Sequence, residues 1–268
     1  MWYHIYEAQM QASAPFRAAA LAALQMRPAL NGAGDSLPMR QMMAALEMAT
    51  RAKLTHVSQP FGIDSVMVEG REAKVTEEVA HDLPFGKLLH FRKDIDAAQP
   101  KVIIVAPLSG HFATLLRNTV KTMLQDHDVY ITDWKNARDV PLSQGRFGFE
   151  DYVDHLIGFL EFLGPGAHIV AVCQPCVQAM VATAVMAERK HPCTPRSLTL
   201  MAGPIDCRIN PTAVNKLATD HPIEWFKSNL ISTVPFPLPG WGRRVYPGFM
   251  QLTAFMAMNP ERHMDAHK

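Results

Sequence analysis

The stretch His168-Ile-Val-Ala-Val-Cys-Gln-Pro-Cys-Val-Gln-Ala179 joins a short β-branched run to a cysteine and then to the start of a helix. A strand that ends in a sharp turn before a helix lifts one side chain above a sheet, provided that the residues two places away on either side are small. Ala171 and Pro175 hold these places around Cys173. Pro175 replaces the usual glycine, but its fixed φ and missing N–H suit the first turn of a helix. The pattern predicts a nucleophile turn with Cys173 at its tip.

Length and charge limit the classes of function. A chain of 268 residues can bury one large core, so we expect one main domain with appendages. The net charge is +1, with 26 basic and 25 acidic residues, which argues against a nucleic-acid partner. No apolar run approaches the roughly 18 residues of a membrane span, and the N-terminus lacks a signal-peptide pattern. We therefore expect no membrane span, a cytoplasmic location and four reduced cysteines.

The order of expected elements predicts the fold class. Two helices, 15–25 and 39–54, precede alternating segments at 66–68, 73–79 and 87–91 that indicate antiparallel strands at the opening edge of a sheet. Strands and helices then alternate: strand 101–106, helix 112–125, strand 129–132, helix 149–163, strand 169–172, helix 175–189 and strand 197–201. This alternation predicts an α/β protein, resembling the α/β-hydrolases, with a mostly parallel sheet and helices on both faces.

Three regions follow from this pattern. Residues 1–60 form an N-terminal helical extension, residues 61–202 form the α/β-hydrolase core, and residues 203–268 begin a lid or cap. The last region is rich in proline and aromatic residues, and the sequence stops inside an expected helix without a C-cap glycine. We therefore expect the chain to be the N-terminal portion of a longer protein, with its C-terminal part incomplete.

The expected site has a nucleophile and two backbone donors. A helix N-terminus favours the thiolate form of cysteine, which is the nucleophilic form. Acyl transfer also needs N–H donors for an oxyanion, supplied in this architecture by the residue after the nucleophile and by the loop after an earlier strand. The first donor is Gln174. The loop is Ala106-Pro-Leu-Ser-Gly-His111, in which Leu108 or Ser109 supplies the second donor.

Other interpretations of Cys173 remain. A buried cysteine often serves as a small apolar side chain. Cys173-Gln-Pro-Cys176 also imitates the redox C-x-P-C motif, although that motif belongs near the start of a small βαβ domain. A zinc site would need four ligands, and Cys193 and Cys207 form no second C-x-x-C. We therefore expect neither a metal nor a cofactor.

A base for Cys173 is harder to find in the sequence. In this fold the acid and the histidine follow the nucleophile along the chain. The candidates after position 173 are Asp206, Asp220, Asp265, His191, His221, His263 and His267. Asp206 follows a strand and is a weak candidate for the acid, but a structural turn role is favoured. His263 and His267 share a helix face, but Met264 replaces the Glu of a zinc-protease pattern.

The sequence resembles the N-terminal two-thirds of the intracellular polyhydroxyalkanoate (poly-3-hydroxybutyrate) depolymerases, cytosolic bacterial enzymes of the α/β-hydrolase superfamily. The segments that carry the resemblance are Met1-Trp-Tyr-His-Ile-Tyr-Glu7, Val102-Ile-Ile-Val-Ala-Pro-Leu-Ser-Gly-His-Phe-Ala-Thr114, Tyr130-Ile-Thr-Asp-Trp-Lys135, Val172-Cys-Gln-Pro-Cys176 and Leu200-Met-Ala-Gly-Pro-Ile-Asp206. The resemblance implies that Cys173 attacks the ester of a stored polyester and forms an acyl-enzyme. It also implies that the triad Asp and His lie in a C-terminal part outside this chain, so that this fragment alone is inactive.

Two other functions stay open. One is an acyltransferase of the polyhydroxyalkanoate synthase type, although the synthases have a glycine-rich turn where this chain has Ala171, Pro175 and Cys176. The other is a catalytically incomplete fragment that binds storage granules. Under the resemblance, the partner is the polyester or the granule surface. Apolar lid residues could contact that surface or could cover the core, and the latter is favoured: Trp225, Phe226, Phe236, Trp241 and Phe249. The sequence does not indicate an oligomeric state.

Overall fold

The computed structural model describes residues 2–26, 37–51, 58–96, 98–108 and 112–257. The chain divides into two compact units, Met1–Val57 and Ser58–Lys268. The first unit contains two helices, α1 (Trp2–Gln25) and α2 (Leu37–Arg51). The expected start of the first helix was wrong, because α1 begins at Trp2 and runs through Pro15. An interior proline removes one N–H donor and crowds the carbonyl four residues earlier, but the Ala- and Leu-rich residues that follow favour helix strongly.

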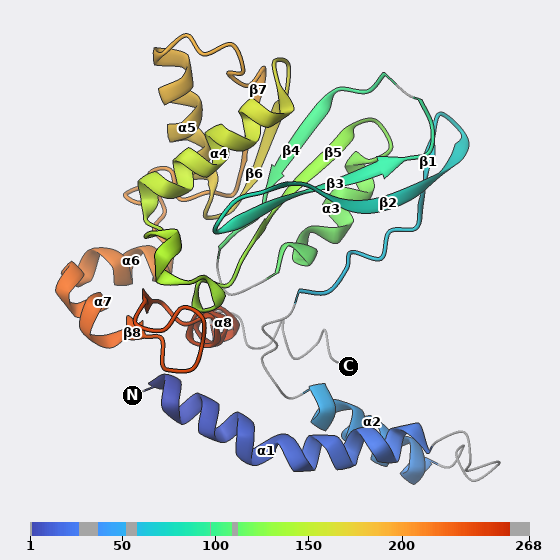
Figure 1. Ribbon diagram of the computed structural model, residues 1–268, viewed down its shortest axis with the longest axis vertical. Coiled ribbons are helices and arrows are strands. Elements are labelled where there is room, and N and C mark those ends of the chain that lie inside the picture. The colour runs from blue at the N-terminus through green and yellow to red at the C-terminus, as the bar shows by residue number, and fades with distance from the viewer. Residues whose placement is uncertain (1, 27–36, 52–57, 97, 109–111, 258–268) are drawn as a thin grey trace. The chain divides into compact units, whose positions relative to one another are not determined.

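The second unit is built on a seven-stranded sheet with the order β1-β2-β3-β5-β4-β6-β7 (Figure 1). The strands are β1 (Ser65–Val68), β2 (Arg71–Asp82), β3 (Gly86–Lys93), β4 (Lys101–Val105), β5 (Asp128–Trp134), β6 (His168–Val172) and β7 (Ser197–Met201). Strands β1, β2 and β3 pair antiparallel, as does β3 with β5. Strands β5, β4, β6 and β7 are parallel. Antiparallel opening strands and a parallel remainder are thus confirmed.

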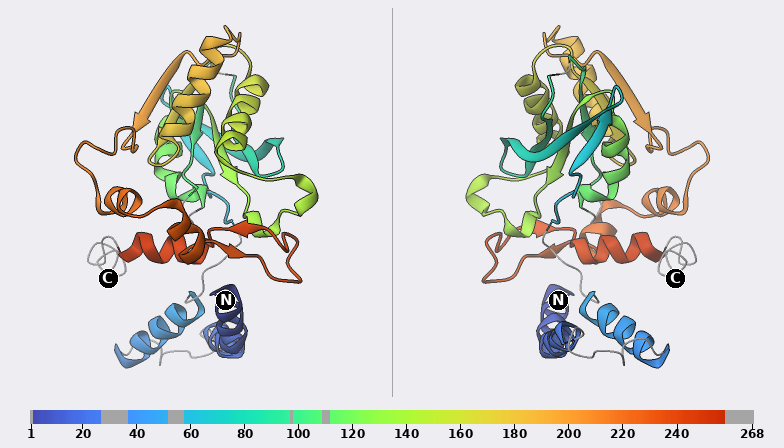
Figure 2. Two further views of the ribbon diagram at one scale, coloured as in Figure 1. Left: turned by 90° about the vertical axis from the view of Figure 1, so that its left-hand side faces the viewer. Right: turned by 90° about the vertical axis from the view of Figure 1, so that its right-hand side faces the viewer.

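Helices cover both faces of this sheet (Figure 2). One face packs on the 3₁₀ turn η3 (Ala113–Leu116) and helix α3 (Arg117–Met123), and the other on α4 (Phe149–Leu163) and α5 (Cys176–Glu188). Successive residues of β4 alternate between the faces, so Ile104 joins the first core and Ile103 the second. Both are fully buried, which is why β4 reads as a continuous apolar run.

The chain after β7 forms short elements. They are α6 (Ala213–Asp220), α7 (Ile223–Asn229), the paired strands β8 (Ser232–Thr233) and β9 (Arg244–Val245), and α8 (Gly248–Ala257). Arg243 anchors this hairpin to the loop after β5, which contains the 3₁₀ turns η4 (Ala137–Asp139) and η5 (Leu142–Gln144). Its buried guanidinium donates to the carbonyls of Val140, Pro141 and Gly145, and burial lowers its pKa. No described helix is long and apolar enough to cross a membrane.

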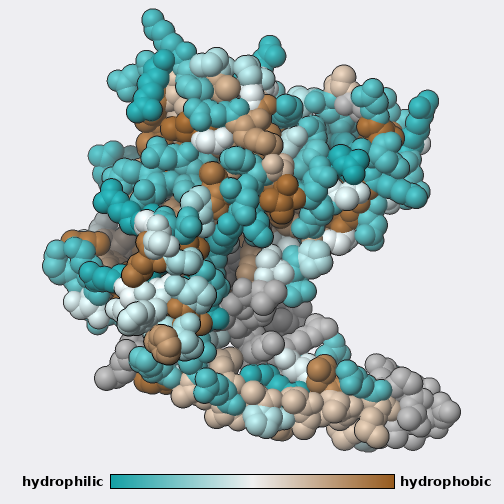
Figure 3. Space-filling model, viewed as in Figure 1, coloured by the Kyte–Doolittle hydropathy of each residue, from teal (hydrophilic) through white to brown (hydrophobic). Residues whose placement is uncertain are grey.

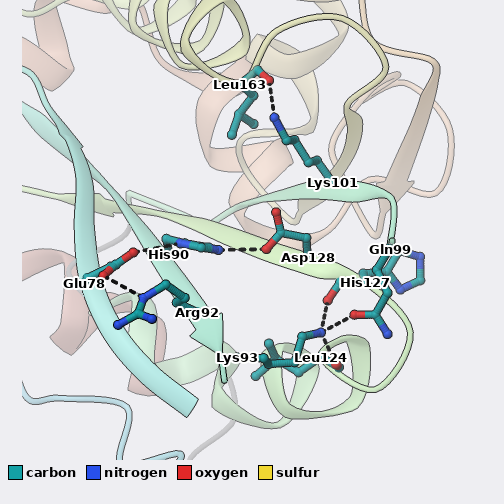
Figure 4. Close-up of polar contacts among 10 residues, drawn as sticks. All are labelled: Glu78, His90, Arg92, Lys93, Gln99, Lys101, Leu124, His127, Asp128 and Leu163. Carbon is teal, nitrogen blue, oxygen red and sulfur yellow. Dashed lines mark hydrogen bonds and ion pairs between the residues drawn. The ribbon is translucent and has the colours of Figure 1, made fainter. Parts of the chain in front are cut away.

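A cluster of polar side chains lies on strands β2, β3 and β5 at the point where β5 begins (Figure 4). Nδ1 of His90 lies 3.1 Å from Oε1 of Glu78, and Nε2 lies 2.7 Å from Oδ1 of Asp128. Burial by itself lowers the pKa of His90, but the hydrogen bonds to Asp128 and Glu78 outweigh it and raise that pKa. Lys93 donates to the backbone carbonyls of Leu124 and His127, each at 2.7 Å. His90, Glu78 and Asp128 therefore satisfy one another, and Lys93 is satisfied by nearby backbone carbonyls.

Candidate active site

Cys173 lies in a strained turn between β6 and α5. Its φ is +67°, in the left-handed region that residues other than glycine seldom adopt. Its N–H donates to the carbonyl of Met201 at the end of β7, at 2.8 Å, and its carbonyl accepts from the N–H of Cys176 at 3.2 Å. The Cys173 residue itself is exposed. The structure therefore has the turn geometry predicted for a nucleophile.

The second cysteine of the motif packs beneath this turn. Cys176 is fully buried, and its thiol donates to the carbonyl of Ala171 at 3.3 Å and to that of Met201 at 3.6 Å. Burial raises the pKa of the Cys176 thiol, which keeps it protonated and able to donate. A Cβ at Gly203 would lie 2.2 Å from Cβ of Cys176, so only glycine fits there. Neither Cys173 nor Cys176 is in a disulfide.

The loop after β4 reaches the nucleophile turn. The N–H of Leu108 donates to Oε1 of Gln174 at 3.0 Å, across 66 positions of sequence. The structure thus brings together two of the residues that were predicted to bind an oxyanion. Ser109, the alternative donor in the loop, lies outside the described residues.

Three side chains hold the backbone of Ala106, where β4 ends. Its N–H donates to Oγ1 of the buried Thr132 at 2.9 Å. Its carbonyl accepts from Nε1 of Trp134 at 3.0 Å and from the hydroxyl of Tyr152 at 3.4 Å. Sequence reasoning missed all three, because these contacts join β5 and α4 to β4. Thr132 and Trp134 lie in the segment Tyr130–Lys135 that carries the resemblance, but nothing in the sequence pairs them with Ala106.

The predicted base candidates do not converge on Cys173 in the described part of the chain. His191 follows the far end of α5, whose 13 residues span about 20 Å, and its Nε2 lies 3.1 Å from Oε1 of Glu161. His221 stacks on Trp225 with ring centroids 4.3 Å apart.

The acidic candidates also face other groups. Asp206 accepts two side-chain hydrogen bonds from Arg208, each at 2.8 Å, and these bonds lower the pKa of Asp206. This geometry agrees with the favoured turn role. Asp220 is the last residue of α6. Asp265, His263 and His267 lie outside the described residues.

Metal ligands do not gather in the described ranges. There, no three His, Cys, Asp or Glu side chains are placed to hold one ion. Cys193 lies between α5 and β7, where its N–H donates to Nδ1 of His191. Cys207 lies after β7, where its sulfur accepts from Nδ2 of Asn215 at 3.3 Å.

The fold and the turn define the class of protein. The sheet is mostly parallel, helices cover both its faces, and a left-handed residue joins a parallel strand to a helix. These are the features of an α/β-hydrolase, and they confirm the predicted fold class.

A family comparison then narrows the class. Residues 202–268, a quarter of the chain, match the family model described as the C-terminus of PHB de-polymerase. PHB stands for poly-3-hydroxybutyrate. The match lies almost wholly beyond the last segment quoted for the resemblance, which ends at Asp206. It therefore supports, from a different part of the chain, the resemblance to PHB depolymerases in the α/β-hydrolase superfamily.

Some solved structures resemble this chain at low sequence identity. No curated protein sequence matches the chain. A hyperthermophilic esterase from the archaeon Pyrobaculum calidifontis has 10% identity and a TM-score of 0.40, covering 66% of this chain and 61% of its own. A 2-hydroxy-6-oxo-6-phenylhexa-2,4-dienoate hydrolase from Rhodococcus sp. strain RHA1 has 13% identity and a TM-score of 0.39. The match covers 73% of this chain and 70% of the hydrolase. A bacterial membrane phospholipase A has 12% identity and a TM-score of 0.40, covering 92% and 73%. The chain therefore spans less than two thirds of the archaeal esterase.

Proposed function

We propose that this protein takes part in the hydrolysis of a polyester such as poly-3-hydroxybutyrate, with Cys173 as the nucleophile that forms an acyl-enzyme. The observation that carries the proposal is the exposed Cys173 at a φ of +67°, next to the start of α5. The family match at residues 202–268 supports the substrate class.

The chemistry begins at the sulfur. The Cys173 thiolate attacks the carbonyl carbon of the ester, and the carbonyl π electrons move to oxygen as the C–S bond forms. Backbone N–H groups of Gln174 and Leu108 stabilise this oxyanion by hydrogen bonds. The oxyanion then re-forms the carbonyl and expels the polymer alkoxide, which takes up a proton. Water cleaves the resulting thioester, and this step releases an acid and restores the thiol.

Proton transfer requires a base and an acid in this scheme. Neither His191 nor His221 forms a hydrogen bond with Cys173 within the described ranges. We therefore assign the base to residues outside those ranges, as the resemblance implies for the triad Asp and His. Under this assignment, the described residues supply the nucleophile and the oxyanion donors.

Apolar side chains after β7 suit contact with a polyester. Among the described residues, seven large apolar side chains of this region are exposed: Ile205, Ile209, Val214, Leu217, Ile223, Phe236 and Trp241. On the face seen in Figure 3, hydrophilic side chains predominate over the second unit, and apolar ones lie between them in small groups. The proposed partner is the polymer or a granule surface, which exposed apolar side chains can contact.

The test compares two cysteine variants. Cys173→Ala removes the nucleophile, whereas Cys193→Ala removes a thiol beyond the far end of α5 and serves as the matched control. We expect Cys173→Ala to abolish both the release of 3-hydroxy acids from amorphous polymer and the acyl adduct detected by intact mass. Cys193→Ala should retain both. Undiminished release by Cys173→Ala would overturn the proposal, as would polymer growth from acyl-thioesters in place of release.

A further inference from the structure

We propose that Gln174 is a positioning residue. In the absence of substrate its side-chain amide oxygen accepts the hydrogen bond of the Leu108 N–H and keeps that N–H oriented toward the site. When an ester is attacked, the oxyanion replaces the amide oxygen as the acceptor. This inference rests on the proposed function. It concerns a side chain, whereas the oxyanion chemistry proposed above uses only the backbone N–H of Gln174.

The Leu108 N–H already has a carbonyl-type partner. It donates to the Gln174 side chain at 3.0 Å. A backbone N–H can only donate, so the atom that faces it must be the amide oxygen and not the nitrogen. A carbonyl-type oxygen therefore already occupies the donor that the substrate oxygen would use. Both residues are half-buried, and the backbone N–H needs a partner when no substrate is present.

The order of donors along the loop after β4 makes Leu108 the residue that faces the site. The N–H of Ala106 is taken by Thr132, and Pro107 has no N–H. Leu108 is therefore the first residue after β4 whose N–H is not committed to a neighbouring strand. Since Ala106 is also held through its carbonyl, little freedom remains between the strand and Leu108. Gln174 fixes the far end of this short segment next to Cys173.

The exchange of acceptors at the Leu108 N–H becomes favourable only in the transition state. A neutral amide oxygen is a better acceptor than a neutral ester oxygen, so replacing the first by the second gains nothing in the ground state. Hydrogen bonds to an ionised acceptor are roughly twice as strong as those between neutral groups. The exchange is therefore favourable once negative charge develops on the substrate oxygen, and an interaction that strengthens in this way accelerates the chemical step.

The test compares two reactions of the same sulfur. Acylation of Cys173 by p-nitrophenyl butyrate passes through an oxyanion, with p-nitrophenolate leaving, whereas alkylation by iodoacetamide displaces iodide and forms none. The ratio of the two rates cancels the thiolate fraction. Gln174→Met keeps the length of the side chain but lacks the oxygen, so the Leu108 N–H is no longer held toward Cys173. We expect this loss of positioning to outweigh the removal of a competing acceptor and to lower the ratio about tenfold, less than the loss of an entire donor.

Two further variants complete the design. Gln174→Glu retains an acceptor for Leu108, but its carboxylate competes with the oxyanion, so the ratio should fall at least as far. Gln178→Met makes the same substitution one turn along α5 and should leave the ratio unchanged. An unchanged or raised ratio in Gln174→Met would overturn this inference alone. If the unsubstituted protein is not acylated at Cys173, that result overturns the proposed function, and the inference about Gln174 is overturned with it. If Gln174→Met does not fold, Gln174→Leu, which also lacks the oxygen, decides by the same criterion.

Discussion

The two ends of the parallel strands use polar groups in opposite ways. Where β5 begins, His90, Glu78, Asp128 and Lys93 bind one another or nearby carbonyls, so that charge is satisfied locally. At the opposite end, where β6 stops, side chains form hydrogen bonds with backbone groups, and Cys173 stays exposed in a left-handed turn. The first arrangement favours stability, whereas the second keeps a reactive group accessible at an energetic cost.

That cost has identifiable compensations. A left-handed conformation at a residue other than glycine costs about 1–2 kcal/mol. Around Cys173 it is offset by the hydrogen bond to Met201, by the burial of Cys176 and by the close approach of Gly203. Contacts at the ends of β6 and β7 therefore support the strained turn, and a substitution that disrupts these contacts should lower the stability of the protein strongly.

Gly203→Ala should have the largest effect on stability. The new Cβ would lie 2.2 Å from Cβ and 2.4 Å from Sγ of Cys176, so the turn or β7 must shift. Overpacking of this kind costs about 3 kcal/mol. We expect that loss in the free energy of unfolding in urea, together with altered alkylation of Cys173.

A rescue variant identifies the clash as the cause. Cys176→Gly in the Gly203→Ala background removes both crowded atoms and should recover part of the loss, although the Cys173 carbonyl remains 3.0 Å from the new Cβ. Gly158→Ala is the matched control, because its Cβ meets only Leu83 at 3.8 Å within a helix. No recovery in the double variant would contradict this account.

Thr132→Val should have an intermediate effect. It leaves the buried N–H of Ala106 without its acceptor, which costs about 2 kcal/mol, whereas Tyr152→Phe removes one of two donors to the Ala106 carbonyl and should cost less. Both changes loosen the segment before Leu108, so acylation of Cys173 should fall more than alkylation. In thermal denaturation we expect Thr132→Val to have a lower melting temperature than Tyr152→Phe. The reverse order would show that the Ala106 N–H is satisfied in another way.

His90→Gln should have the smallest effect, and one that depends on pH. Because the folded-state pKa of His90 is raised, its contribution is fully present below the ordinary value of 6.5 and is lost as pH rises through the raised value. The pKa values of Glu78 and Asp128 are lowered, so their contributions are lost only as pH falls through those lowered values. The stability difference from the unsubstituted protein should reach about 1 kcal/mol near pH 5.5 and shrink by pH 8.5.

His168→Gln is the control for this titration, because its Nδ1 faces the hydroxyl of Ser197 and not a carboxylate. A stability difference for His90→Gln that stays constant between pH 5.5 and 8.5 would contradict the role assigned to the cluster at the start of β5.

The core elements were the part most readily predicted. Helix 149–163 and strand 197–201 have the expected bounds, because the periodicity of their apolar residues is local information. The expected helix 112–125 is instead a 3₁₀ turn followed by the seven residues of α3. Its ends depend on packing against the sheet, which no local pattern records.

The sequence by itself determined the alternation of strands and helices, the place of Cys173 after a buried strand, and the resemblance that names a substrate class. These follow from residue types at fixed spacings, which set local backbone geometry and burial. Only the tertiary structure decided that Cys176 packs under the turn, that Gly203 makes room for it, and that the Gln174 side chain reaches Leu108. Such contacts join segments tens of residues apart, so they exist only once the sheet has brought the strand ends together.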